Sequence, residues 1–146
     1  MEPKTEYVVG FAFADCGTRV LLIHKLKPKW QRGLLNGVGG KIEDRETSAQ
    51  AMAREFEEEA GIPVNPKDWR KFAEIIGTNY VIHCFMTHLG GTQALRVLSV
   101  TDEQVTWYRT ADLPSLPTLM NLKWLSPLAL DRDLVTASVD DPSGDQ

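Results

Sequence analysis

The sequence predicts a single α/β domain, and three observations support this prediction. Segments with the composition of β-strands both precede and follow one strongly signalled helix. The length of 146 residues suits one hydrophobic core, and no linker divides the chain. Hydrophobic residues make up 42% of the sequence and charged residues 25%, the composition of an ordinary globular domain. We expect one domain over residues 1–135, followed by a flexible tail over residues 136–146.

The chain is predicted to open with a β-hairpin. Residues 7–14 (YVVGFAFA) and 19–24 (RVLLIH) have the composition of strands, and the intervening DCGT supplies a turn. Residues 25–40 (KLKPKWQRGLLNGVGG) contain Pro28 and four glycines. That composition predicts a shaped loop with a short strand at most.

A helix is predicted over residues 48–60. Thr47 and Gln50 form a capping-box pattern at its start, and Gly61 followed by Pro63 supplies the stop. Apolar residues recur at helical spacing along one face, which we expect to pack on the core. The residues of that face are Ala49, Met52, Ala53, Phe56 and Ala60.

The second half of the chain predicts three further strands and one further helix. Residues 69–77, 79–87 and 105–109 have strand composition. Residues 121–130 (NLKWLSPLAL) predict a helix that Pro127 makes irregular. From Asp131 onward the composition is that of a frayed tail.

Charge and composition exclude several classes of function. The net charge of −4 disfavours general nucleic-acid binding, which usually needs a basic surplus. The sequence has neither a membrane-spanning apolar run nor a signal peptide. Cys16 and Cys84 lie far apart and outside any CxxC pair, so we expect reduced thiols. These features favour a cytoplasmic protein without a membrane anchor.

The predicted helix 48–60 concentrates acidic residues on one face. Glu55, Glu58 and Glu59 stand at positions i, i+3 and i+4, where like charges repel. Arg54 is the only basic residue inside the helix. Mg²⁺ prefers hard oxygen ligands such as carboxylates, so the cluster is a candidate metal site. An acidic, solvent-exposed helix face is the alternative interpretation.

Residues 40–62 match a longer motif around these acids. Gly40, Glu46, Arg54, Glu55 and the residues up to Ile62 fill the pattern G-x5-E-x7-R-E-U-x-E-E-x-G-U, where U is a bulky apolar residue. This pattern resembles the Nudix box, and the chain resembles the MutT-like members of the Nudix hydrolase family. The resemblance implies an α/β/α sandwich with a mixed sheet. It also implies a loop-helix-loop that binds a divalent metal and hydrolyses a nucleoside diphosphate linked to another group.

The resemblance also implies roles for individual box residues. Glu58 and Glu59 match the principal metal ligands, and Glu55 matches a ligand or the general base. The carbonyl of Gly39 matches a backbone oxygen of the metal shell. The implied cofactor is Mg²⁺, with Mn²⁺ as a substitute.

Three further residues around the box have implied roles. Arg54 and Glu46 match the pair that holds loop and helix in register. Glu103 matches a carboxylate from outside the box that completes the metal site or acts as the base, and Asp102 competes for that assignment.

The segment before the box resembles the subgroup that hydrolyses oxidised purine nucleoside triphosphates. Asn36 matches that subgroup's base-contacting asparagine, and Lys41 follows the glycines where it could orient a polyphosphate. Trp30 and Trp124 match aromatic residues at the base, which stack on nucleobases. Met120 and Asn121 stand where the subgroup often carries paired acids, so an acid contact to the base is not available there, but the Asn121 amide could still pair with a base.

The sequence therefore predicts a metal-dependent pyrophosphohydrolase acting on a small nucleotide. The favoured reaction converts a nucleoside triphosphate to a monophosphate and pyrophosphate, with modified or oxidised purines as candidate substrates in nucleotide pool sanitation. One alternative is hydrolysis of a larger derivative, such as a dinucleoside polyphosphate, ADP-ribose or an RNA cap. The alternative outside enzymes is a nucleotide-sensing module on the same scaffold. We expect a monomer or a homodimer.

Overall fold

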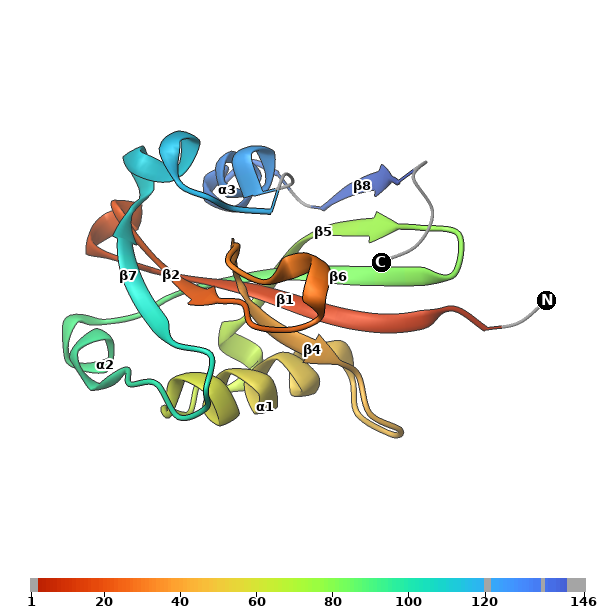
Figure 1. Ribbon diagram of the computed structural model, residues 1–146, viewed down its shortest axis with the longest axis horizontal. Helices are drawn as coiled ribbons and strands as arrows, with labels where there is room; N and C mark the ends of the chain where they lie inside the picture. The colour runs from red at the N-terminus through yellow and green to blue at the C-terminus, as the bar shows by residue number, and fades with distance from the viewer. Residues whose placement is uncertain (1–2, 120–121, 135, 142–146) are drawn as a thin grey trace.

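The computed structural model describes residues 3–119, 122–134 and 136–141. In this part of the chain, one sheet lies between helix α1 (Ser48–Ala60) on one face and helix α3 (Leu122–Leu130) on the other (Figure 1). The sheet contains both parallel and antiparallel strand pairs. The predicted α/β/α sandwich with a mixed sheet is confirmed.

The strands predicted from composition are all present. They are β1 (Thr5–Ala14), β2 (Arg19–His24), β5 (Arg70–Ile76), β6 (Tyr80–His88) and β7 (Val105–Arg109). Two short strands, β3 (Leu35–Asn36) and β4 (Val38–Lys41), lie in the glycine-rich segment, where the sequence predicted at most one. Strand β8 (Ala137–Asp140) and helix α2 (Gly91–Arg96) were not predicted.

Strand β1 organises the sheet. It runs parallel to β6 from the pair Thr5 and Tyr80 to the pair Phe13 and His88. On its other edge, β4 pairs antiparallel with residues 7–10, whereas β2 pairs with residues 13–14. Strands β2 and β4 therefore share one edge of β1 and separate from each other. The chain between them must arch away from the sheet, and this arch forms the wall of the main cavity described below.

Two apolar layers fill the space between the sheet and the helices. Met52 and Phe56 of α1 pack on one face, where the Phe56 ring meets the Trp69 ring edge-on at 5.2 Å between centroids. Leu122 and Leu125 of α3 pack on the other face. Both faces of the sheet are covered, which explains why residues 7–14 are apolar almost throughout rather than alternating.

Helix α1 has the predicted bounds. The Gln50 backbone N–H donates to Thr47 Oγ1 at 3.1 Å, and the Thr47 backbone N–H donates to Gln50 Oε1 at 2.8 Å. Gly61 ends the helix in the left-handed region with φ of 80°. The capping box and the stop were both readable from the sequence, because these signals are local to the helix.

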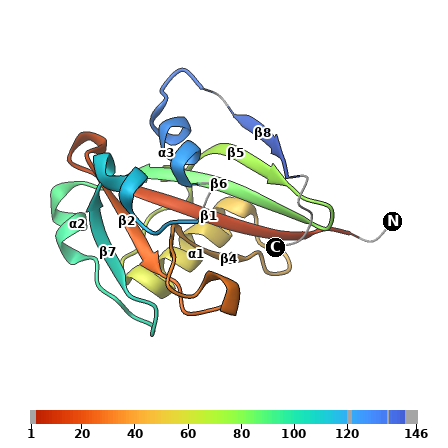
Figure 2. The ribbon, with the colours of Figure 1, turned by 45° about the horizontal axis from the view of Figure 1, so that its top comes forward.

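The predicted tail requires a correction. Ala137–Asp140, inside the segment expected to be flexible, forms β8 and pairs in parallel with β5 at the edge of the sheet (Figure 2). The Asp141 backbone N–H continues this pairing to the Ile76 carbonyl at 2.8 Å, and the Tyr80 hydroxyl donates to Asp141. Backbone hydrogen bonds to an open sheet edge order this short polar segment, and composition does not signal them. Residues 142–146 lie outside the described residues.

Two other features concern helices. Helix α3 continues through Pro127, although the sequence predicted an irregularity there. The predicted start of that helix at residue 121 lies outside the described residues. None of the helices in the described ranges is long and apolar enough to cross a membrane.

We predict that Thr47→Ala lowers the free energy of unfolding by about 1 kcal/mol, because it removes the side-chain acceptor of the capping box. Thr47→Ser keeps a hydroxyl oxygen at the same position and serves as the matched control. Urea unfolding of the three proteins measures the difference. Equal stabilities of the alanine and serine variants would contradict the prediction.

Candidate active site

Helix α1 presents its acidic face to the glycine strand β4. The Glu55 side chain is 13% exposed and lies directly against Gly40. A Cβ atom at Gly40 would lie 2.4 Å from Glu55 Oε1, and one at Gly39 would lie 2.0 Å from the Val8 carbonyl oxygen. Only glycine therefore lets the strand pass between β1 and the carboxylate.

Arg54 is the common partner of the acids around it. Its Nε and Nη2 atoms donate to the two oxygens of Glu46 at 3.0 and 2.7 Å, in a bidentate arrangement. Its Nη1 atom lies 3.0 Å from Glu55 Oε1 and 3.3 Å from Glu58 Oε2. Nη2 also donates to the Lys41 carbonyl at 3.1 Å. One guanidinium thus joins the end of β4, the following loop and the helix.

These contacts shift the pKa values of Arg54 and Glu46. The family resemblance assigns this pair to holding the loop and the helix together. The hydrogen bonds from Arg54 hold the pKa of Glu46 below its ordinary value. The pKa of Arg54 is raised. The hydrogen bond to Glu46 is the largest cause, burial opposes the shift, and Glu55 adds to it. Both groups are therefore charged at neutral pH.

Glu59 differs from its neighbours because its carboxylate is buried without full pairing. Glu59 Oε2 has no hydrogen-bond partner among the described residues. Burial raises the pKa of Glu59 to about 8, and the nearby charge of Glu55 adds to the shift, whereas Lys25 opposes it. A buried oxygen without a partner is costly, and a divalent cation would satisfy it. The donor set at this point of the helix fits a hard cation.

The other two acids of this face are placed differently. Burial raises the pKa of Glu55, and the hydrogen bond from Arg54 opposes this shift. Glu58 is 55% exposed, and its partner among the described residues is Arg54. Within the part of the chain that the structure describes, no three acidic, histidine or cysteine side chains already converge on one point. Glu55 and Glu58 both contact Arg54, and they do not converge on a common point.

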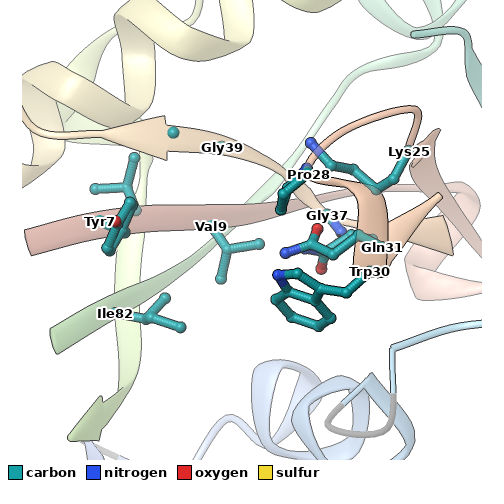
Figure 3. Close-up of a pocket in the computed structure, with 12 residues that line it drawn as sticks. Tyr7, Val9, Lys25, Pro28, Trp30, Gln31, Gly37, Gly39 and Ile82 are labelled. Atoms are coloured by element: carbon teal, nitrogen blue, oxygen red, sulfur yellow. Dashed lines mark hydrogen bonds between the residues drawn. The ribbon is translucent and has the colours of Figure 1, made fainter. Parts of the chain in front are cut away.

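A cavity of about 280 Å³ opens between β2 and β4 (Figure 3). Its floor is formed by Tyr7, Val9 and Ile82, on the face of the sheet that α3 covers. Gly39 and Gly40 form one end, next to the acidic helix. The cavity therefore combines an apolar floor with a backbone-lined end that leads to the carboxylates.

The residues predicted to bind substrate are not all at this cavity. Asn36 lines it, and its Oδ1 atom accepts a hydrogen bond from the Gly37 N–H at 2.8 Å, which orients the amide. Trp30 lines it as well and is 53% exposed. Lys41 does not line this cavity. Its exposed side chain lies at a separate hollow beside Glu55.

Two residues of the C-terminal half were also predicted to contact the base. Trp124 lies on α3, is 38% exposed and is not among the described residues that line the cavity. Asn121 lies outside the described residues. The roles of both in binding a base stay predictions.

Glu103 is buried next to the cavity, with both carboxylate oxygens occupied. Its Oε1 atom accepts from Lys25 Nζ at 3.1 Å, and its Oε2 atom accepts from the backbone N–H groups of Leu26 at 2.7 Å and Lys27 at 3.2 Å. Burial opposes ionisation, but these donors outweigh it and lower the pKa of Glu103. All three donors come from the loop after β2. The competing Asp102 is exposed.

One cavity residue could not be identified from the sequence. Gln31 is 7% exposed and lines the cavity beside Trp30 and Pro28 (Figure 3). Its side-chain amide has no hydrogen bond to any other described residue, so donor and acceptor are free for a ligand. In the sequence it is one polar residue in a basic loop, and only the folded arch reveals its burial.

A comparison with protein-family models identifies one family. The family model described as NUDIX domain matches residues 4–129. The sequence has no significant match among curated proteins.

Solved structures share the fold. A MutT structure from work on Aliivibrio salmonicida and Vibrio cholerae has 22% identity and a TM-score of 0.68, over 87% of this chain and 97% of that one. The NUDIX domain of Shewanella oneidensis NrtR, complexed with ADP-ribose, has 18% identity and a TM-score of 0.69, over 88% of each chain.

A third structure is larger than this chain. It is a bifunctional NMN adenylyltransferase/ADP-ribose pyrophosphatase from Francisella tularensis, complexed with AMP and a Mn ion. Its identity is 16% and its TM-score is 0.73, over 89% of this chain and 42% of that one.

We predict that Glu46→Gln lowers the free energy of unfolding by about 1 to 3 kcal/mol at pH 7, because it removes a charged hydrogen-bond acceptor from Arg54. The folded-state pKa of Glu46 lies below its ordinary value of 4.5. The stabilisation is therefore complete above that value and is lost as the pH falls through the lowered pKa. Urea unfolding between pH 7 and pH 3 should show the two proteins converge. A difference that stays constant with pH would contradict this origin.

Proposed function

The chain belongs to the NUDIX domain family, and on that premise we propose that it is a metal-dependent pyrophosphohydrolase that converts a nucleoside triphosphate to a monophosphate and pyrophosphate. The observation that carries this proposal is the buried Glu59 oxygen without a partner, on the helix that borders the cavity's glycine end. A retired site would not need to keep a carboxylate in that state. The geometry supports a cation at this position and a phosphate chain beside it.

The acids of α1 and the adjoining backbone would hold the cation. Glu58, Glu59 and Glu55 provide carboxylate oxygens, and Gly39 provides a carbonyl, which together suit Mg²⁺ with Mn²⁺ as a substitute. The bound cation would neutralise phosphate oxygens and support attack by water. We leave Glu103 out of this ligand set, because both of its oxygens are bonded to residues 25–27.

The remaining residues orient the substrate and the acids. Arg54, bonded to Glu46, keeps the helix fixed against the loop, so that the carboxylates face the glycine end. Glu55, which is largely enclosed between Arg54 and Gly40, is placed to take a proton from the attacking water. Lys25 lines the cavity and offers the phosphate chain a positive charge.

The cavity itself favours a nucleobase as its occupant. Tyr7, Val9 and Ile82 offer an apolar surface to a flat ring, and Trp30 offers a stacking face. Asn36 and Gln31 add polar atoms that can contact the edge of a base. Two residues from the sequence prediction, Lys41 and Trp124, would need to approach the substrate from outside this cavity.

A second substrate class is favoured by two of the similar structures. The S. oneidensis domain is complexed with ADP-ribose, and the F. tularensis protein is an ADP-ribose pyrophosphatase. Their TM-scores of 0.69 and 0.73 are as high as the 0.68 of the MutT structure. A nucleoside diphosphate sugar is therefore the alternative substrate, hydrolysed by the same acidic helix.

We also propose a reducing compartment for the protein. Cys16 is exposed and Cys84 is buried, and both thiols are free. An exposed free thiol favours the cytoplasm over an oxidising environment. A monomer or a homodimer suits the size of the domain.

We predict that Glu58→Gln and Glu59→Gln each reduce turnover by a factor of about 100 or more, since each removes a ligand charge from the cation site. Both variants should fold, and Glu59→Gln should match the wild-type melting temperature at pH 7, because burial keeps Glu59 largely protonated there and glutamine is also neutral. Glu57→Gln is the matched control, since Glu57 is exposed on the same helix. Mg²⁺-dependent pyrophosphate release and calorimetric metal titration measure the effects. Near-normal turnover of folded Glu59→Gln would overturn the metal assignment.

We predict that a nucleoside triphosphate releases pyrophosphate rather than phosphate in the presence of Mg²⁺. The test is a panel of canonical and oxidised nucleoside triphosphates together with ADP-ribose, dinucleoside polyphosphates and capped RNA. Turnover of ADP-ribose alone would replace the favoured substrate with the alternative while keeping the chemistry. Metal and nucleotide binding without turnover of any substrate would support the nucleotide-sensing module instead.

A further inference from the structure

The Glu103 carboxylate gathers three donors from one short stretch of chain. Both backbone donors, the N–H groups of Leu26 and Lys27, use the same oxygen, Oε2. The Lys25 ammonium uses the other oxygen, Oε1. The Glu103 side chain is 9% exposed, so these bonds are made away from bulk water. Charged hydrogen bonds in such surroundings are among the stronger contacts in a protein.

The stretch that Glu103 grips is the beginning of the cavity wall. Residues 25–31 contribute Lys25, Pro28, Trp30 and Gln31 to the lining. The wall is closed on itself by hydrogen bonds from the Gly33 N–H to the Lys25 carbonyl and from the Lys25 N–H to the Leu34 carbonyl, both at 2.9 Å. Glu103 is the described acceptor for the N–H groups of residues 26 and 27. The position of the wall's first turn therefore depends on this carboxylate.

The segment that carries Glu103 also holds the end of the acidic helix. The Leu98 N–H donates to the Ala60 carbonyl at 3.1 Å, and the Val100 N–H donates to the Glu59 carbonyl at 3.4 Å. Leu98 and Val100 lie over Gly61, where an added Cβ atom would be 3.2 Å from each side chain. One segment, residues 98–103, thus contacts the helix that bears the proposed ligands and the wall that bears the base contacts.

We propose that Glu103 is a positioning residue, which fixes the wall of the nucleotide cavity relative to the metal-binding helix. It acts through the backbone of residues 26 and 27 and through Lys25, and it neither ligates the cation nor takes the proton. Its effect on binding rests on the function proposed above, whereas its effect on the wall does not. Loss of the hydrogen bonds to Glu103 displaces the cavity wall. This raises KM and leaves the chemical step largely intact.

The hydrogen-bond pattern allows a sharp test with glutamine. Because both N–H groups share Oε2, a glutamine that places its carbonyl oxygen there keeps both bonds. The same substitution removes the charge that a metal ligand or a general base requires. Alanine removes both the charge and the bonds. Asp102→Ala is the matched control on the same turn, because Asp102 is exposed.

The experiment combines amide hydrogen exchange with steady-state kinetics on Glu103→Gln, Glu103→Ala and Asp102→Ala. We expect Glu103→Gln to keep the Leu26 and Lys27 amides protected, with kcat within about fivefold of wild type. Glu103→Ala should lose protection of both amides by a factor of about 10 or more and raise KM by a similar factor, with a much smaller change in kcat. Asp102→Ala should resemble wild type in every measurement.

Two results would overturn the proposal. One is a collapse of kcat in Glu103→Gln with both amides still protected, which would make Glu103 a ligand or a base. The other is unchanged protection of the two amides in Glu103→Ala. The exchange measurement needs no substrate, so it decides the grip on the wall even if the proposed reaction fails. If the alanine variant is too unstable, the glutamine variant alone separates the two roles.

Discussion

The site depends on one guanidinium held among carboxylates. Arg54 makes a bidentate pair with Glu46 and also reaches Glu55 and the Lys41 carbonyl, so it connects the loop after β4 to helix α1. The helix in turn is fixed to the sheet by Met52 and Phe56. The buried apolar stripe of α1 sets which face of the helix meets the sheet. The Arg54 contacts add a link from the acidic side of the helix to the loop after β4.

The same cluster leaves one buried carboxyl oxygen of Glu59 without a hydrogen-bond partner among the described residues. Arg54 satisfies Glu46 and shares itself between Glu55 and Glu58, but its reach does not extend to Glu59 Oε2. A protein selected for stability alone would gain by replacing that buried carboxylate with a neutral side chain. The Glu59 carboxyl group reaches the backbone of Gly39, in the glycine strand. A buried oxygen without a partner costs stability. Such a cost is typical of a binding site whose ligand supplies the missing partner.

How much of this could be predicted from the sequence depends on whether each signal is local. The capping box of Thr47 and Gln50, the Gly61 stop and the spacing of the acids on α1 are set within a few residues, and the structure has all of them. Helix α2 carries only half of such a signal: Gln93 Oε1 accepts from the Gly90 N–H at 3.1 Å, but glycine has no side chain to accept in return, and Leu95 is 88% exposed. Strand β8 is recruited by a distant sheet edge. The burial of Gln31 likewise arises only from the arch between β2 and β4.

The division of the site between distant segments has a consequence for specificity. The acids come from α1, the glycines from β4 and the polar wall from the loop after β2. Strands β2 and β4 are joined through the edge of β1 with which both pair. Strands that separate along an edge leave a cavity, but they do not fix its width. Contacts outside the sheet also connect these parts, because residues 98–103 bond to the end of α1 and to the start of the wall. Changes in the wall can therefore alter the shape of the cavity while helix α1 stays in place, because residues 25–31 are not part of the apolar cluster that holds the helix against the sheet.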